Sequence, residues 1–295
     1  MRMIIFICLL LSGFQLIAQQ EVTIEVKNNQ DNSVDFLYTK KGATSYTLTL
    51  QLSNVSNSLD RPSPHYILKN SSGKLFTMKP INKEQGINFS YSYKYVQGSF
   101  QPQKIDKSFP YLLPFAKGKE VYVSESTYVL ERYMNRPAPK GWKAYAFNGE
   151  ALDSVFAVRK GIVTFVEQSK NINHNASYTS EKNMIVVEHQ DGSFAEYKGF
   201  RKNGINVKVG DTVLPNDYLG GLIQVEAPEK HLSLVIYYLS SLSEGEKTAE
   251  FTYITPNFLT ETGIAPLVSG KAYITAIDTE VLTKEMTRKE KKKYK

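Results

Sequence analysis

Histidine is the side chain best suited to hold a metal ion or move a proton near neutral pH, and this chain of 295 residues has four. They are His65, His174, His189 and His231. The stretch PEKHLSLVIYY places His231 directly before an alternating apolar run that predicts a strand. Alternate residues of a strand face the same way, so a His-x-His pair there would point two imidazoles into one site. The second position of such a pair is Ser233, so only half of the pair is present.

Other catalytic chemistry has little support. The sole cysteine, Cys8, lies in MRMIIFICLLLSGFQLIAQQ, which has the positive start and short apolar core of a secretory signal covering residues 1–18. The mature chain would then have no thiol and no disulfide. No serine lies in a nucleophile elbow, and Gly220-Gly221 lacks the setting of a phosphate-binding loop. We expect an exported protein, periplasmic or extracellular.

The elements that would position these residues are mostly strands. The chain is 41% hydrophobic and 22% charged, with 19 tyrosines and 15 phenylalanines, a mixture that favours β-structure. Within residues 19–105, TSYTLTLQLSNVSNS and INFSYSYKYVQGSF alternate regularly and predict a small β-sandwich. One face of the second run is aromatic, and we expect it to point inward rather than to stack on sugar rings; it carries Phe89, Tyr91, Tyr93 and Tyr95.

A second unit is predicted over residues 106–272, after prolines that interrupt strand pairing. NMIVVEHQDGSFAEYKGF places a Gln-Asp-Gly turn between two alternating arms, a strong hairpin signal. The expected fold class is all-β, an N-terminal β-sandwich followed by an antiparallel β domain. Residues 273–295 are predicted to be a basic tail. Its stretch from Lys284 to Lys295 has seven basic and two acidic residues, and this net charge of +5 together with Arg2 accounts for six of the seven net positive charges. Nucleic acid is therefore not an expected partner, while the tail could touch an anionic surface.

The motifs of the second unit resemble those of the lysostaphin-like (LytM-type) zinc metallopeptidases, which cut peptidoglycan cross-links. AYAFNGEALDSVFAVRKGIVTFVEQ resembles the segment around that family's first two metal ligands. NMIVVEHQDGSFAEYKGFRKNGINVKVGDTV is similar to its central hairpin, and KHLSLVI falls where the family has HLHFEV. The resemblance implies a β domain with a groove. It also implies a catalytic zinc held by His-x-x-x-Asp and by the second histidine of His-x-His.

The family's metal ligands do not carry over to this chain. The three ligand positions fall on Ala144, Asn148 and Ser233. Alanine has no ligand atom, an asparagine amide is neutral, and a serine hydroxyl is a poor zinc ligand beside imidazole. The family's Tyr-x-His falls on Tyr197 and Gly199, so one of its two proton-handling histidines is also missing and His231 is a vestige. The resemblance therefore predicts a degenerate member with no zinc cofactor.

Three functions stay open at this stage. The first is a secreted, inactive peptidase-like protein that binds a cell-wall peptide or a partner protein in its former groove, lined by Tyr145, Asn148, Tyr197 and His231. The second is an active zinc-dependent murein endopeptidase whose non-standard site draws on His231, Glu150, Asp153 or His174. The third is a structural extracytoplasmic module. The two remaining histidines are predicted to be a strand-surface residue near the turn, His189, and a residue without a partner, His65.

Overall fold

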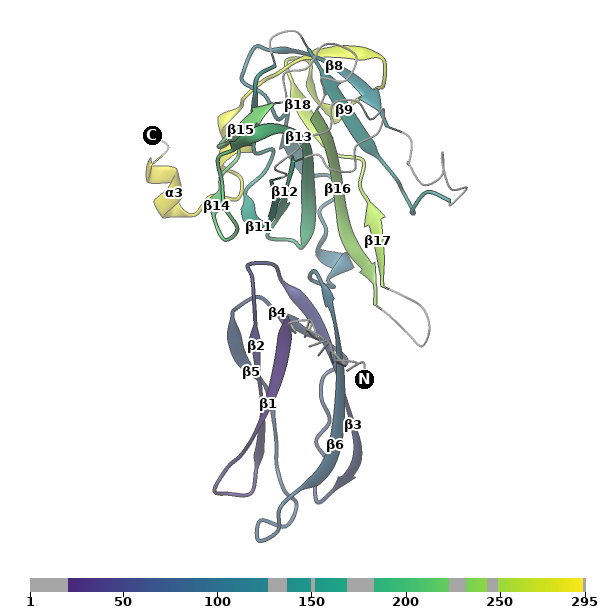
Figure 1. The fold of residues 1–295 in the computed structure, drawn as a ribbon, viewed down its shortest axis with the longest axis vertical. Coiled ribbons are helices and arrows are strands. Elements are labelled where there is room, and N and C mark those ends of the chain that lie inside the picture. Colours follow the sequence, from purple (N-terminus) through teal and green to yellow (C-terminus); the bar gives the residue numbers. More distant parts are fainter. Residues whose placement is uncertain are drawn as a thin grey trace, which may run out of the picture.

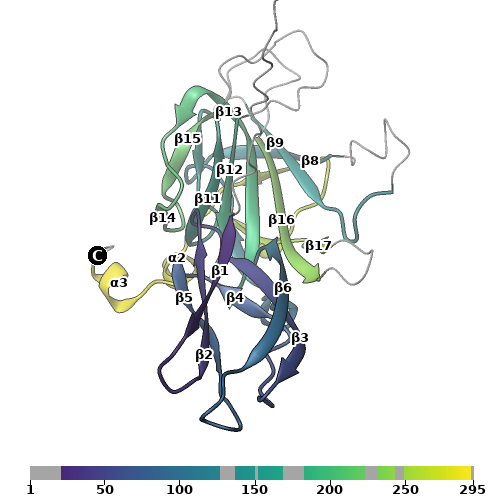
Figure 2. The same cartoon turned by 60° about the horizontal axis from the view of Figure 1, so that its bottom comes forward.

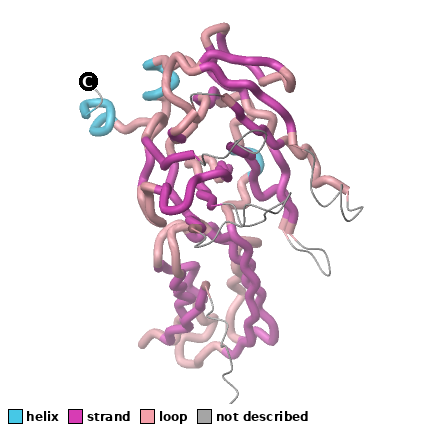
Figure 3. Tube along the Cα trace, turned by 45° about the horizontal axis from the view of Figure 1, so that its top comes forward, coloured by secondary structure: helices cyan, strands magenta, loops and turns pink. Residues whose placement is uncertain are grey.

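The structure is a computed structural model that describes residues 21–126, 137–149, 152–168, 183–222, 232–242 and 249–293. The expected signal segment, residues 1–18, lies outside these ranges. The fold is all-β, as the sequence predicts: two stacked β units are joined by a short linker (Figure 1). Few helical turns accompany the strands (Figure 3). No helix within the described ranges is long and apolar enough to cross a membrane.

The N-terminal unit is a sandwich of two three-stranded antiparallel sheets. One sheet contains β1 (Val22–Asn28), β2 (Val34–Lys40) and β5 (Ser72–Met78). The other contains β4 (Tyr66–Leu68), β3 (Tyr46–Ser56) and β6 (Asn88–Gln97). The inward residues of both sheets form one apolar core, which includes Phe36, Leu48 and Leu68. Alternation along each strand is what buries one face and leaves the other in water.

The aromatic row of β6 packs inward, as predicted. Phe89, Tyr93 and Tyr95 are partly buried against the sandwich core. The ring of Phe89 lies 5.5 Å from that of Phe36. Tyr91 keeps 40% of its surface exposed, yet its ring meets Phe36 edge-on at 5.7 Å. The row therefore serves mainly as the inner layer of the sandwich.

The second unit is built on a large sheet with the strand order β14-β11-β12-β13-β16-β9-β8-β20, and all neighbours along this order are antiparallel. Its strands are β8 (Glu120–Glu125), β9 (Ala144–Asn148), β11 (Gly161–Glu167), β12 (Asn183–Glu188), β13 (Ser193–Ile205), β14 (Thr212–Val213), β16 (Leu232–Ser241) and β20 (Lys271–Ile274). Flanking strands are β7 (Pro110–Leu112), β10 (Ser154–Phe156), β15 (Tyr218–Leu222), β17 (Glu250–Tyr253), β18 (Asn257–Thr260) and β19 (Gly263–Pro266).

The hairpin between β12 and β13 turns where the sequence predicts it. The amide of His189 donates to the carbonyl of Ser193 at 2.8 Å, and Gly192 has a φ of 92°. Glycine adopts this left-handed backbone without steric cost, which explains the Gln-Asp-Gly turn. The hairpin fixes the register of β13, the central strand of the sheet.

The second unit extends beyond residue 272, where we expected the basic tail to begin. That boundary falls inside β20, whose Tyr273 pairs with Val121 of β8. Two short helices follow, α2 (Thr279–Thr283) and α3 (Arg288–Lys293). Asp278 caps α2 by accepting from the amides of Glu280 and Val281, and this helix packs on β7. Val281 and Leu282 share a small apolar cluster with Leu112 and Leu259. Val281 and Leu282 thus pack the C-terminal segment against the second unit, although its basic composition predicted a tail.

The two units meet through a linker and a buried polar contact. The linker contains the short 3₁₀ helix η1 (Pro102–Lys104). The Glu188 carboxylate at the end of β12 accepts from the Ser45 amide at 2.8 Å and from the Ser45 and Thr44 hydroxyls of the sandwich. Burial raises the pKa of Glu188, while these hydrogen bonds act in the opposite direction. The contact ties the edge of the sandwich to the sheet of the second unit.

Candidate functional site

The outward face of the large sheet brings together positions that are far apart in sequence. Ser233 of β16 lies opposite Ala146 of β9 on one side and opposite Lys198 of β13 on the other. Ala146 in turn lies opposite Ser124 of β8. Cross-strand partners point to the same side of a sheet, so these four residues form one row. We call this row, with Ala144, Asn148 and Glu196 beside it, the outward face.

The three positions that the resemblance aligns with zinc ligands share this face. Ala144 and Asn148 lie on the same side of the regularly paired strand β9, about 13 Å apart at the usual rise per residue. Ser233 lies beside Ala146, midway between them. A zinc ion needs all its ligand atoms within about 2.3 Å. Alanine, asparagine and serine at these positions do not make up a zinc ligand set.

Nothing else in the parts of the chain that the structure describes gathers metal ligands. No group of three or more histidine, cysteine, aspartate or glutamate side chains is placed to hold a metal there. Asp153, one candidate for a replacement site, is exposed. The other candidates, Glu150, His174 and His231, lie outside the described ranges. Of the four residues considered for a non-standard zinc site, Asp153 is thus the one that lies in the described ranges.

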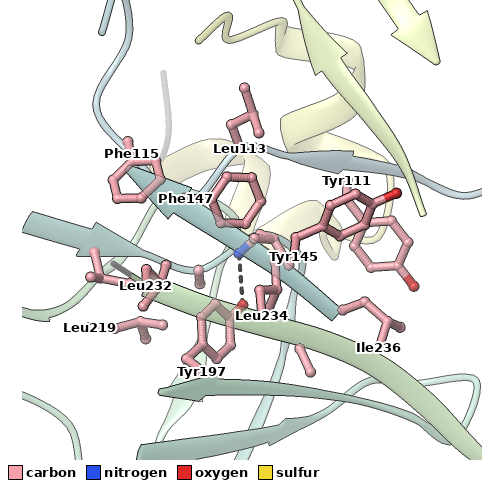
Figure 4. Packing of buried hydrophobic residues seen from close by; sticks show 14 of the residues in the cluster. Tyr111, Leu113, Phe115, Tyr145, Phe147, Tyr197, Leu219, Leu232, Leu234 and Ile236 are labelled. Atoms are coloured by element: carbon pink, nitrogen blue, oxygen red, sulfur yellow. Dashed lines mark hydrogen bonds between the residues drawn. The ribbon is translucent and has the colours of Figure 1, made fainter. Parts of the chain in front are cut away.

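Two of the residues expected to line the groove lie in the core instead. Tyr145 and Tyr197 both pair with Leu234, whose side chain points to the side of the sheet opposite Ser233 (Figure 4). Their exposed fractions are 1% and 0%. The Tyr197 hydroxyl accepts a hydrogen bond from the Val158 amide at 3.0 Å. Burial raises the pKa of both tyrosines. Buried side chains cannot contact a ligand that arrives from solvent, so the outward face must be defined by their neighbours.

The outward face carries one pair of opposite charges. The Lys198 ammonium lies 2.5 Å from the Glu196 carboxylate, and both side chains are partly exposed. Ser124, Ser233 and Asn148 are half-exposed beside them, with Tyr122 of β8 opposite Asn148. Small polar side chains, one cation and one anion thus share this surface. It offers hydrogen-bond donors and acceptors to a ligand that lies along it.

Gly199, which the resemblance aligns with a histidine of the family, lies at an irregularity in β13. Its φ is 123°, a conformation that side chains rarely adopt. The register of β12 against β13 shifts there, since Asn183 pairs with Phe200 while Met184 pairs with Lys198. A histidine at this position would strain the backbone as it stands. The backbone at this position therefore suits glycine and disfavours a larger side chain.

His189 is buried, which corrects the prediction of a strand-surface residue. It is 3% exposed, and its ring lies under the hairpin turn against Tyr111 at 5.9 Å. Its Nδ1 lies 2.9 Å from the Ser193 hydroxyl, which donates to Asp191 at 2.7 Å. Since that hydroxyl donates to the carboxylate, Nδ1–H is the donor to Ser193. The pKa of His189 is held far below its usual value by burial and by Arg159.

Arg159 is the residue that sequence reasoning missed. Its guanidinium, 2% exposed, binds Asp191 at 2.9 Å, the Tyr111 hydroxyl at 3.2 Å and both carboxylate oxygens of Glu285. It also lies 3.7 Å above the ring of Phe109. The arginine stands in an alternating run with no local sign of burial. Because Ser193 and His189 are closed off in this same cluster, it is an internal polar network and not a hydrolytic site.

His65, predicted to lack a partner, is half-buried in the sandwich unit. Its ring lies 5.4 Å from that of Phe100 in an edge-on arrangement. This is a ring contact and supplies no metal ligand set.

Of the comparisons with known proteins, the one with solved structures is the one that finds matches. No protein-family model and no curated protein matches this sequence. Among solved structures, the chain is similar to a protein assigned as a glycyl-glycine endopeptidase, lytM, from Ruminococcus gnavus, with 17% identity and a TM-score of 0.29. That match covers 50% of this chain and 56% of the other, so this chain spans just over half of that relative.

Two further structures are similar. An M23 metalloprotease, pseudoalterin, from the deep sea is 15% identical, with a TM-score of 0.32; the match covers 58% of this chain and 96% of that one. Csd3 from Helicobacter pylori is 12% identical, with a TM-score of 0.28; the match covers 78% of this chain and 71% of that one.

Proposed function

We propose that this is an exported, peptidase-like protein that binds an extended peptide on its outward face without cutting it. The observation that carries the proposal is the row Ser124, Ala146, Ser233 and Lys198. The resemblance in sequence puts a lost ligand position into this row, at Ser233. The side chains in the row offer hydrogen bonds and one positive charge.

The chemistry of the face suits a peptide that carries a carboxylate. The Lys198 ammonium is partly exposed and already pairs with one carboxylate, so it can attract a second from the ligand. The hydroxyls of Ser124 and Ser233 and the amide of Asn148 can exchange hydrogen bonds with a peptide backbone. The expected source of the peptide is the cell-wall stem or a segment of a wall-associated protein. Export to the periplasm or the cell exterior would place the protein beside both.

Tryptophan at Ser233 tests the proposal. Its bulk would fill the centre of the outward face, and we expect binding of the mature protein to purified murein or to a stem peptide to fall at least tenfold. The matched control is Ser90→Trp, the same change at an exposed strand position of the sandwich. Calorimetric titration with the stem peptide would measure both. Equal affinity of the two variants would refute the proposal, provided that both keep the wild-type melting temperature.

The same purified proteins can be used to distinguish the two alternative functions from the proposed one. Retention of one zinc per chain after incubation and desalting, with chelator-sensitive release of peptides from murein, would overturn the proposal in favour of a zinc peptidase. A wild-type protein that binds neither murein nor stem peptide would favour the structural module. Binding without zinc retention and without peptide release is the outcome expected here.

A further inference from the structure

The helix α3 is held on the body by a single acidic side chain. Glu290 accepts from Lys160 at 2.7 Å, and it also accepts from the Thr287 amide at 2.6 Å. The Thr287 hydroxyl returns a bond as acceptor from the Glu290 amide at 3.3 Å, which completes a capping box. The bond from Lys160 and the cap lower the pKa of Glu290 to about 2, so this side chain stays ionised at any physiological pH.

The segment that leads to α3 is also fixed. Val281, Leu282 and Met286 are buried, and the Glu285 carboxylate binds the buried Arg159 through both of its oxygens. Lys160 donates a further bond to the Glu285 carbonyl at 3.2 Å. The residues before α3 are therefore fixed to the second unit, and α3 projects from its surface (Figures 1 and 2).

Four of the five cations of α3 lie well around the helix from Glu290, namely Arg288, Lys289, Lys291 and Lys292. At about 100° per residue, Arg288 and Lys292 lie about 160° around the helix from Glu290, and Lys289 and Lys291 lie about 100° from it. All four cations are exposed. Between Lys284 and Lys293 there are two acidic residues, Glu285 and Glu290, and both are paired with basic side chains of the second unit. The outer half of the helix is thus a cationic face with no acidic residue on it.

We propose that α3 is a peripheral docking element for an anionic lipid surface. A flat array of phosphate headgroups can meet all four cations at once, whereas a convex face such as this does not enclose a single polymer strand. The described part of the helix has no apolar residue to insert, so the contact is electrostatic, reversible and sensitive to salt. This inference does not depend on peptide binding by the outward face.

Vesicle partition tests the proposal. The full mature chain should bind phosphatidylcholine vesicles that contain phosphatidylglycerol, and should ignore vesicles of phosphatidylcholine alone. Each basic residue near an anionic membrane contributes about fivefold to partition. Replacing Arg288, Lys289, Lys291 and Lys292 with serine should therefore lower partition by about 600-fold. The matched control makes the same charge change on the sandwich, at the exposed residues Lys27, Lys79, Lys83 and Lys94.

Three results would overturn the proposal. The first is equal loss in the control, which would indicate net charge and not this helix. The second is binding that persists at about 1 M salt, where the Debye length falls to about 3 Å. The third is binding to soluble polyphosphate without binding to vesicles, which would indicate that α3 binds an anionic polymer and not a lipid surface. The double variant Lys160→Ala/Glu290→Ala keeps the net charge but releases the helix, and we expect it to bind several-fold more weakly than wild type.

Discussion

Arg159 and Glu285, 126 residues apart, are joined by two parallel hydrogen bonds of 2.9 and 2.6 Å inside the second unit. The bidentate geometry matches the planar guanidinium to the carboxylate. It also explains why Arg159 can be almost fully buried, since Asp191 and Tyr111 satisfy the other side of the same group. The C-terminal segment is therefore part of the folded body up to this point.

Removing Glu285 should destabilise the protein strongly. Glu285→Ala leaves a buried guanidinium with half of its partners, and breaking one side of a buried pair costs about 3 kcal/mol in the free energy of unfolding. Urea denaturation followed by tyrosine fluorescence would measure the loss. The control is Lys74→Ala, which breaks an ion pair whose lysine is largely exposed, and it should change the stability far less. A loss for Glu285→Ala no larger than the control's would contradict the network.

Acid should destabilise the protein through His189. Its pKa in the folded state is depressed by burial and by Arg159, whereas an unfolded histidine titrates near pH 6.5. Below about pH 6.5 the unfolded state binds a proton that the folded state does not, so stability falls as the pH falls. Between pH 7.5 and 5.0 the loss from this residue is about 2 kcal/mol.

The variant His189→Gln isolates that contribution. Its stability is expected to be lower at pH 7.5, because the packing changes, but its decline between pH 7.5 and 5.0 should be smaller by about 2 kcal/mol. Urea titrations of both proteins at the two pH values give the comparison. Parallel declines would show that His189 does not titrate differently in the two states. Glu188, with a raised pKa, is present in both proteins and cancels.

Glu188 should hold the two units in a fixed relation. Glu188→Ala leaves the buried Ser45 amide and hydroxyl without their acceptor, a cost of about 2 kcal/mol. The loss should appear as faster proteolysis near η1, together with a wider particle in small-angle scattering. The control Glu196→Ala removes a carboxylate from the same face of the sheet that pairs with Lys198 and not with the sandwich, and it should leave both measurements unchanged. An unaltered scattering profile for Glu188→Ala would show that the linker alone sets the arrangement.

Tyr197 should matter for stability and not for ligand binding. Tyr197→Phe removes the acceptor of the buried Val158 amide and is expected to cost about 1–2 kcal/mol. Affinity for a stem peptide should be unchanged, because the side chain lies on the core side of the sheet. Thermal unfolding and peptide titration of the one variant separate these effects. Weaker peptide binding by a stably folded Tyr197→Phe variant would show that Tyr197 takes part in ligand binding after all.

Part of the error about the groove was avoidable from sequence alone. Tyr145 and Asn148 are separated by an odd number of positions, so on a regular strand they face opposite sides. The burial of Tyr197 was less accessible, because it depends on the register of β13 against β16. A shift of one residue would reverse every side chain of that strand. The structure sets that register by pairing Tyr197 with Leu234.

The all-β class and the turn at Gln190-Asp191-Gly192 could be predicted from the sequence, because residue period and turn chemistry are local properties. Which residues share the outward face, and the burial of Arg159, depend on strand pairing and packing between distant parts of the chain. The same is true of the anchoring of the segment after residue 272 by Glu285 and Glu290. Those partners lie more than a hundred residues from Arg159 and Lys160 along the chain, and only cross-strand register and packing bring them together.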